Sequence, residues 1–92
     1  MTDKLSVVFR AERSGDHKGQ VTAVFPTEID HGPYYTCYAH VGQHSACSRG
    51  WYANTRAATP DEYADLLREL RGIYETGEDA VTLDVRKRAN WA

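Results

Sequence analysis

Apolar and polar residues alternate along three separate runs in the first half of the chain. The first run, residues 4–12, has Leu5, Val7, Phe9 and Ala11 at every second position. The second run covers residues 20–25 and the third covers residues 34–41. A period of two residues is typical of half-buried β-strands. Because segments rich in turn-forming residues separate the runs, we expect a hairpin of two strands followed by a third strand.

The two faces of the third predicted strand differ in chemistry. One face carries Tyr35, Cys37, Ala39 and Val41, and the other carries Tyr34, Thr36, Tyr38 and His40. A domain of this size can cover only one face of a sheet well. We therefore expect the cysteine face to contact the core and the tyrosine and histidine face to remain open to solvent.

A helix is predicted to begin at Pro60. Thr59 is a suitable N-cap, proline fits the first helical position, and Glu62 completes a capping box. An apolar stripe at helical spacing follows: Tyr63, Leu66, Leu67, Leu70, Ile73 and Tyr74. Charged residues, among them Arg68 and Arg71, occupy the solvated face. Gly77 can end the helix, and renewed alternation over residues 81–86 predicts a fourth strand.

The predicted order of elements is therefore β-β-β-α-β. A helix with a single apolar stripe buries it most simply against one face of an antiparallel sheet. We expect one domain, residues 1–92, of the α+β class, with two layers: an antiparallel sheet of about four strands and one helix on one face. The predicted core consists of Phe9, Phe25, Leu66, Leu70, Ile73 and Leu83. Residues 43–58 show no period, so this segment is either a functional loop or contains a short helix.

Composition narrows the classes of function. The chain has 92 residues and a formal net charge of -2, which argues against bulk nucleic-acid binding because that normally requires a strongly basic surface. No apolar run approaches the ~20 residues of a membrane span, and the first residues lack the layout of a signal peptide. We expect a soluble, cytoplasmic protein in which Cys37 and Cys47 are free thiols.

Chemistry-bearing side chains are concentrated between residues 31 and 56. This segment holds three of the four histidines, both cysteines, four of the six tyrosines and one of the two tryptophans. Aromatic rings can stack on a flat ligand, and arginine and histidine can donate to anionic oxygens. The predicted binding residues are Tyr34, Tyr38, His40, His44, Arg49, Trp51, Tyr52 and Arg56. The alternative is that the rings only cover the sheet and the arginines are only solvated.

Other sites were weighed against this surface. Cys37, His40, His44 and Cys47 have residue types and spacing that suggest zinc. Strand periodicity places Cys37 and His40 on opposite faces, so we expect no metal. His44 and Cys47 are close in sequence, but no catalytic motif accompanies them, and we expect neither enzymatic activity nor a cofactor. The basic run at residues 86–88 fits a solvated strand end, with a contribution to an anion site as the alternative.

Several motifs in the middle of the chain carry a resemblance. The run Tyr-Ala-His-Val-Gly-Gln-His at residues 38–44 is followed by Cys-Ser at 47–48, Trp-Tyr at 51–52, Thr-Arg at 55–56 and Ala-Thr-Pro-Asp-Glu-Tyr at 58–63. With these motifs, and with residues 19–26, the chain resembles small proteins encoded by bacteriophages and prophages. The likeness spans most of the chain. It implies interference with host defence, either by binding a host protein or by capturing a signalling nucleotide.

We therefore expect a non-enzymatic binding protein in the cytoplasm of a bacterial host cell, which counteracts host defence by sequestering a nucleotide-like anionic signalling ligand. One alternative is an inhibitor that blocks a host defence protein, as anti-CRISPR proteins do, with Trp51 and Tyr52 as interface anchors. A small zinc-binding domain is the other. The expected partners are a small anionic molecule or a host protein, without a membrane, and unprotected sheet edges also permit a homodimer or higher oligomer.

Overall fold

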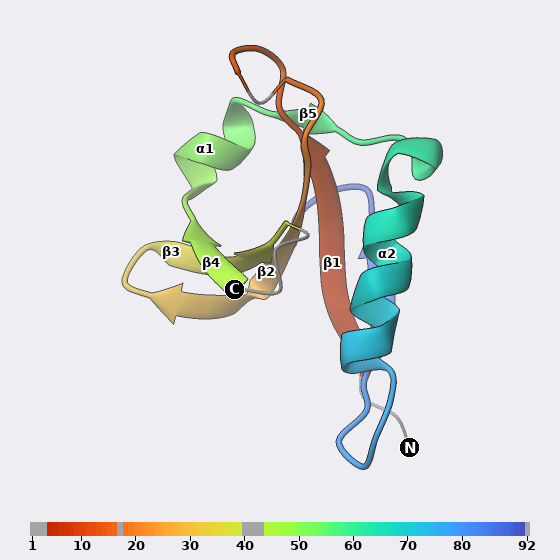
Figure 1. Cartoon of the computed structure of the whole chain (residues 1–92). Coiled ribbons are helices and arrows are strands. Elements are labelled where there is room, and N and C mark those ends of the chain that lie inside the picture. Colours follow the sequence, from red (N-terminus) through yellow and green to blue (C-terminus); the bar gives the residue numbers. More distant parts are fainter. Residues whose placement is uncertain (1–3, 17, 40–43, 92) are drawn as a thin grey trace.

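The computed structural model describes residues 4–16, 18–39 and 44–91. Six strands form one sheet, and the two helices lie on opposite sides of it (Figure 1). The strands are β1 (Lys4–Ala11), β2 (Val21–His31), β3 (Tyr34–Tyr38), β4 (His44–Cys47), β5 (Arg56–Ala57) and β6 (Thr82–Arg86). The helices are α1 (Arg49–Ala53) and α2 (Pro60–Tyr74). The predicted α+β class is confirmed, and β4, α1 and β5 occupy the segment that showed no period.

Strand β1 lies at the centre of the sheet. On one side it pairs with β2, followed outward by β3 and β4, all antiparallel. On its other side it pairs with β5 at Arg10 and Ala11, and with β6 from Lys4 to Val8. The predicted antiparallel pairing is confirmed for the other strand pairs, but β6 runs parallel to β1, which the sequence pattern does not predict. The pairing is parallel because α2 carries the chain back to the Lys4 end of β1, and parallel strands require such a crossover.

Helix α2 begins as its sequence predicts. Thr59 Oγ1 accepts from the backbone N–H of Glu62 at 3.3 Å, and Glu62 Oε1 accepts from the backbone N–H of Thr59 at 2.8 Å. This reciprocal capping box satisfies donors that the first turn leaves without helical partners. The helix ends at Tyr74, before Gly77, whose φ of 89° lies in the left-handed region that glycine tolerates.

The main core lies between α2 and the sheet. Its buried members are Leu5, Val7, Phe9, Ala23, Phe25, Tyr38, Leu66, Leu70 and Leu83. Burial of one Leu or Phe side chain contributes about 1.5–3 kcal/mol. The prediction that Ile73 is part of the core is wrong, because this residue is 46% exposed. In the last turn of α2 the ring of Tyr74 packs on Phe25 instead, with ring centroids 5.3 Å apart.

A second buried cluster covers part of the opposite face of the sheet. It consists of Val24, Tyr35, Cys37 and Cys47, with Trp51, Tyr52 and Trp91 packed against it. Helix α1 supplies Trp51 and Tyr52, and the segment after β6 supplies Trp91. The expectation of an open second face is therefore wrong. Within the described ranges, no helix combines the length and the apolar character needed to cross a membrane.

Candidate functional site

The structure describes seven of the eight residues predicted to bind a ligand and separates them. Tyr38 is 2% exposed and belongs to the main core on the α2 side. The prediction of an open stacking face at Tyr38 is wrong, because both faces of β3 are covered. Helix α2 covers the face on which the Tyr38 side chain lies. Tyr34, at the β2–β3 hairpin, is 40% exposed, and its ring centroid lies 5.1 Å from that of His31. His40 lies outside the described residues.

His44 also lies on the α2 side of the sheet. Its Nε2 is 2.6 Å from Tyr74 Oη, and its ring centroid is 5.0 Å from that of Tyr38. Burial raises the pKa of Tyr74, so the phenol stays protonated at neutral pH and can donate to the imidazole. This contact joins the edge strand β4 to the end of α2, which is a structural role for His44.

Arg49 and Tyr52 take part in the packing of the second cluster. Arg49 donates to Tyr35 Oη from Nε at 3.2 Å and from Nη2 at 2.8 Å. Its guanidinium carbon lies 5.2 Å from the ring centroid of Trp91. The guanidinium of Arg10 lies 4.3 Å from the ring centroid of Tyr52. Such cation–π contacts stabilise the packing of these rings.

Arg56 is held by an ion pair. Its Nη1 and Nη2 atoms donate to the two carboxylate oxygens of Glu62 at 2.8 and 2.6 Å. The hydrogen bonds from Arg56 and from the backbone of Thr59 lower the pKa of Glu62 to about 2. Of the seven predicted residues that the structure describes, only Trp51 lines one of the cavities described below.

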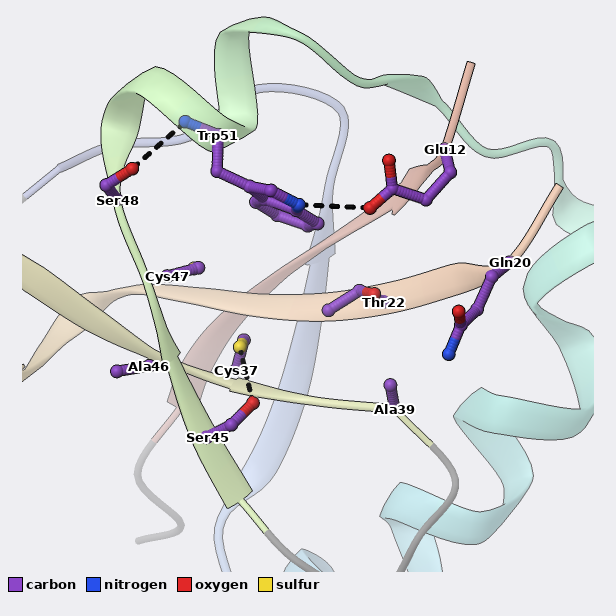
Figure 2. A pocket seen from close by; sticks show the side chains of 10 residues that line it. All are labelled: Glu12, Gln20, Thr22, Cys37, Ala39, Ser45, Ala46, Cys47, Ser48 and Trp51. Carbon is purple, nitrogen blue, oxygen red and sulfur yellow. Dashed lines mark hydrogen bonds between the residues drawn. The ribbon is translucent and has the colours of Figure 1, made fainter. Parts of the chain in front are cut away.

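A cavity of about 340 Å³ lies between α1 and the second face of the sheet (Figure 2). Its lining residues are Glu12, Gln20, Thr22, Cys37, Ala39, Ser45, Ala46, Cys47, Ser48 and Trp51, and we call it the thiol cavity. Trp51 Nε1 donates to Glu12 Oε1 at 3.0 Å, and the backbone N–H of Trp51 donates to Ser48 Oγ, the N-cap of α1, also at 3.0 Å. These two bonds fix the indole in the cavity wall.

The two thiols in this cavity differ in acidity. Cys37 and Cys47 come from the neighbouring strands β3 and β4, and both side chains belong to the second buried cluster. Cys37 Sγ lies 3.1 Å from Ser45 Oγ. The neighbouring Cys47 thiol, together with the hydroxyl of Ser45, lowers the pKa of Cys37 to about 7 although burial opposes the shift. The neighbouring Cys37 thiol in turn raises the pKa of Cys47, so Cys37 is the more acidic of the two.

The sheet separates this cavity from His44. The imidazole packs with Tyr38 on the α2 side, whereas Cys37 and Cys47 belong to the cluster on the α1 side. A catalytic pair of His44 and Cys47 is therefore excluded. The proposed zinc ligands that the structure describes do not converge either, because His44 lies on the α2 side of the sheet and Cys37 and Cys47 lie on the α1 side. Among the residues that the structure describes, no group of three His, Cys, Asp or Glu side chains could hold a metal ion.

Two adjoining cavities lie on the α2 side. The more enclosed one, of about 420 Å³, is lined by Phe9, Ala57, Ala58, Pro60, Tyr63, Val85, Arg86 and Lys87. The other, of about 440 Å³, is lined by Pro60, Tyr63, Ala64, Leu67, Arg68 and Arg71. Because they share Pro60 and Tyr63, we treat them as one feature and call it the tyrosine cleft.

The tyrosine cleft combines an aromatic wall with positive charge. The ring of Tyr63 stacks on that of Phe9, with centroids 4.3 Å apart and 13° between the planes. Four cations line the cleft: Arg68, Arg71, Arg86 and Lys87. None of the lining residues that the structure describes carries a carboxylate, although Asp65, Glu75 and Asp84 pair with three of the cations from outside the lining. In the sequence, the basic run at residues 86–88 indicates an anion site as one alternative, and Arg86 and Lys87 of this run line the cleft. Tyr63 is predicted only as part of the apolar stripe of the helix.

Comparison of the chain with protein-family models, with curated proteins and with solved structures gives no match. The two cavities and their lining residues are therefore the basis of the functional proposal.

Proposed function

We propose that this chain is a non-enzymatic binding protein that captures a small anionic ligand with a flat apolar part, such as a nucleotide-like signalling molecule, in the tyrosine cleft. One observation carries the proposal: two adjoining cavities share Tyr63, and their described lining residues include four cations and no carboxylate. Volumes of this size fall within the roughly 300–1,000 Å³ that is typical of small-molecule sites.

Arg86 already donates to Asp84 at 2.8 Å, but two other cations of the cleft, Arg68 and Arg71, have more distant partners and can respond to an anion. Arg68 pairs with Asp65 at 3.3 Å, and these two side chains are 80% and 83% exposed. Arg71 lies 3.7 Å from Glu75. Exposed ion pairs contribute about 0–1 kcal/mol, so an incoming phosphate or carboxylate competes with them at low cost.

Lys87 and Tyr63 give the cleft two further recognition elements. Lys87 is exposed and supplies three N–H donors. Tyr63 is half-buried and borders both cavities, which suits contact with a flat ring system. The thiol cavity offers the opposite electrostatics, because the lining residues that the structure describes include the carboxylate of Glu12 and no cation. An anionic ligand is therefore better matched to the tyrosine cleft.

The resemblance to bacteriophage and prophage proteins supplies the biological setting of the proposal. A protein that holds a nucleotide-like signal in a stoichiometric complex lowers the free concentration of that signal in the host cell. The alternative, blocking of a host defence protein, has less support. Its predicted anchors, Trp51 and Tyr52, are both half-buried. The indole of Trp51 already donates to Glu12, and the ring of Tyr52 already packs against the guanidinium of Arg10.

The test is a thermal-shift and calorimetric screen of nucleotides and cyclic dinucleotides. A ligand that binds only the folded protein stabilises it by about 2.7 kcal/mol at 100 times Kd, which is a readily measured rise in Tm. Lys87→Glu is expected to abolish the shift. Lys18→Glu makes the same charge reversal at an exposed lysine in the turn before β2 and is expected to preserve it.

A second variant probes the shape of the cleft without removing a charge. Ala57→Trp places a bulky side chain at an exposed position of β5 that borders the cleft, and it is expected to prevent binding. The proposal is wrong if no compound in the screen changes Tm, or if Lys87→Glu and Ala57→Trp both bind as well as the unmodified protein.

A further inference from the structure

The thiol cavity contains two groups that attract a cation, which has the opposite charge to the ligand proposed for the tyrosine cleft. Within the described part of the chain, the cavity lining includes the carboxylate of Glu12 and neither a lysine nor an arginine. It also includes the indole of Trp51, and both side chains are half-buried. The face of an aromatic ring attracts positive charge, and partial burial weakens the screening of a carboxylate by water, so the two groups together favour a cationic ligand.

We propose that the thiol cavity binds a small primary ammonium ion, whose charged nitrogen lies against Glu12 and Trp51 and whose short alkyl chain lies along Ala39 and Ala46. The cavity volume of about 340 Å³ is at the lower end of the roughly 300–1,000 Å³ that is typical of small-molecule sites, so the ligand is small. Ala39 and Ala46 give the cavity an apolar part of its lining that suits a hydrocarbon chain.

A primary ammonium group suits the polar lining better than a quaternary one. It has three N–H donors, as the lysine side chain has. Gln20 and Thr22 also line the cavity, and their side-chain oxygens can accept such donors. A quaternary ammonium ion has no N–H group and forms none of these hydrogen bonds.

The carboxylate of Glu12 is held in place by the β1–β2 hairpin and by helix α1. The backbone N–H of Glu12 donates to Gln20 O at 3.0 Å, and the N–H of Gly19 donates to Glu12 O at 2.9 Å. At the side chain, Trp51 Nε1 donates to Oε1 at 3.0 Å. A carboxylate accepts through two oxygens, so this bond leaves capacity for a further donor. Such preorganisation lowers the entropic cost of binding.

The indole of Trp51 is fixed at its other end. Its backbone N–H donates to Ser48 Oγ, and the ring packs against the second buried cluster. Figure 2 shows the indole and the Glu12 carboxylate next to each other on one side of the cavity, with Thr22 and Ala39 across from them. An ammonium ion in this space can therefore contact the ring and the carboxylate at the same time.

Two arginines on this side of the sheet have partners away from the cavity. Arg10 donates to Thr55 Oγ1 at 2.9 Å and to Thr55 O at 2.6 Å. Arg49 donates to Tyr35 Oη. Neither arginine lines the thiol cavity, so the charge of Glu12 is available to a cation from solution.

The test is a titration of the full chain with n-butylammonium chloride, followed in proton–nitrogen NMR spectra through the indole N–H signals of Trp51 and Trp91. Trp51→Phe removes one of the two signals and thereby assigns them. We expect a saturable shift of the Trp51 signal that sodium chloride at the same concentration does not produce. n-Butanol, which has the same chain without the charge, and n-butyltrimethylammonium chloride, which lacks N–H donors, are both expected to bind more weakly.

A matched pair of variants tests the role of the carboxylate. Glu12→Gln removes the charge but keeps an oxygen for Trp51 Nε1, and it is expected to weaken binding of n-butylammonium by about tenfold or more, as is typical for loss of a hydrogen bond to a charged group. Glu78→Gln makes the same change at an exposed position in the turn after α2 and is expected to leave the dissociation constant unchanged.

Three results would overturn the proposal: no saturable shift of the Trp51 signal, equal affinity for n-butylammonium and one of the two comparison compounds, or equal affinity of Glu12→Gln and the unmodified protein. If Glu12→Gln does not fold, the three compounds on the unmodified protein still decide the matter. Failure of the nucleotide screen would not affect this test, because the tyrosine cleft lies on the other side of the sheet.

Discussion

Arg56 and Glu62 form a two-point ion pair that connects β5 to the first turn of α2, with nitrogen–oxygen distances of 2.8 and 2.6 Å. The same carboxylate accepts from the backbone N–H of Thr59. Glu62 therefore completes the capping box of α2 and also binds β5 through Arg56. Arg56, predicted to bind ligand, is occupied in this structural link.

This link predicts an acid-dependent loss of stability. The pKa of Glu62 is lowered to about 2 from an ordinary value of 4.5. Its contribution to the free energy of unfolding is present above pH 4.5 and is lost as the pH falls toward 2. Glu62→Gln is expected to lower Tm at pH 7 and to make little difference near pH 2. Thermal unfolding of both proteins across this range checks the prediction, and parallel curves at all pH values would contradict it.

The N-cap of α2 gives a second prediction. Thr59→Ala removes the hydroxyl that accepts from the N–H of Glu62 and is expected to lower the free energy of unfolding by about 0.5–2 kcal/mol. Urea denaturation measures the change. Ser14→Ala, at an exposed position in the turn after β1, is the control and should have little effect.

Two consecutive members of the apolar stripe of α2, Leu70 and Ile73, should respond very differently to truncation. Leu70 is 0% exposed and Ile73 is 46% exposed. Leu70→Ala is expected to lower the free energy of unfolding by about 2–5 kcal/mol, whereas Ile73→Ala should cost much less because its side chain stays largely in water. Equal losses in urea denaturation would show that Ile73 is buried in solution.

The segment after β6 is predicted to stabilise the second cluster through Trp91. Its ring centroid lies 4.5 Å from that of Tyr35 and 5.0 Å from that of Tyr52. Aromatic pairs contribute about 0.5–1.5 kcal/mol each beyond burial, so loss of the two pairs alone in Trp91→Ala should reduce the free energy of unfolding by about 1–3 kcal/mol, and loss of the indole's burial adds to this. Trp91→Phe retains a ring and should recover part of this loss in the same denaturation experiment.

The parts of the fold that sequence predicts are those with a local signal. Helix α2 has a capping box and an apolar stripe, and both can be recognised in the sequence of the helix and its N-cap alone. Strands β1 and β2 and their hairpin are confirmed for the same reason. Helix α1 has five residues and β5 has two, which is too short for any hydrophobic period to emerge. The parallel pairing of β6 with β1 depends on where α2 delivers the chain, and no local pattern encodes that.

The candidate binding residues were misplaced for a related reason. Alternation shows that Tyr38 and Cys37 face opposite ways but not which face meets α2. When both faces of a strand are covered, tyrosine and cysteine are equally compatible with either side, so Tyr38 could not be recognised as a core residue. Nothing in the sequence distinguishes Arg49 from Arg56. In the structure, Arg49 donates to Tyr35 of β3, and Arg56 donates to Glu62 of the following helix. Such contacts are determined only by the tertiary structure.

The central place of β1 determines how the chain can fold (Figure 1). The hairpin of β1 and β2 can form early because the two strands are neighbours in sequence. Pairing of β1 with β6, in contrast, joins segments separated by most of the chain. Closing that loop is entropically demanding and slow. Amide protons of β1 that are bonded to β6 should consequently exchange with deuterium only when the entire domain opens, which would make them reporters of global unfolding.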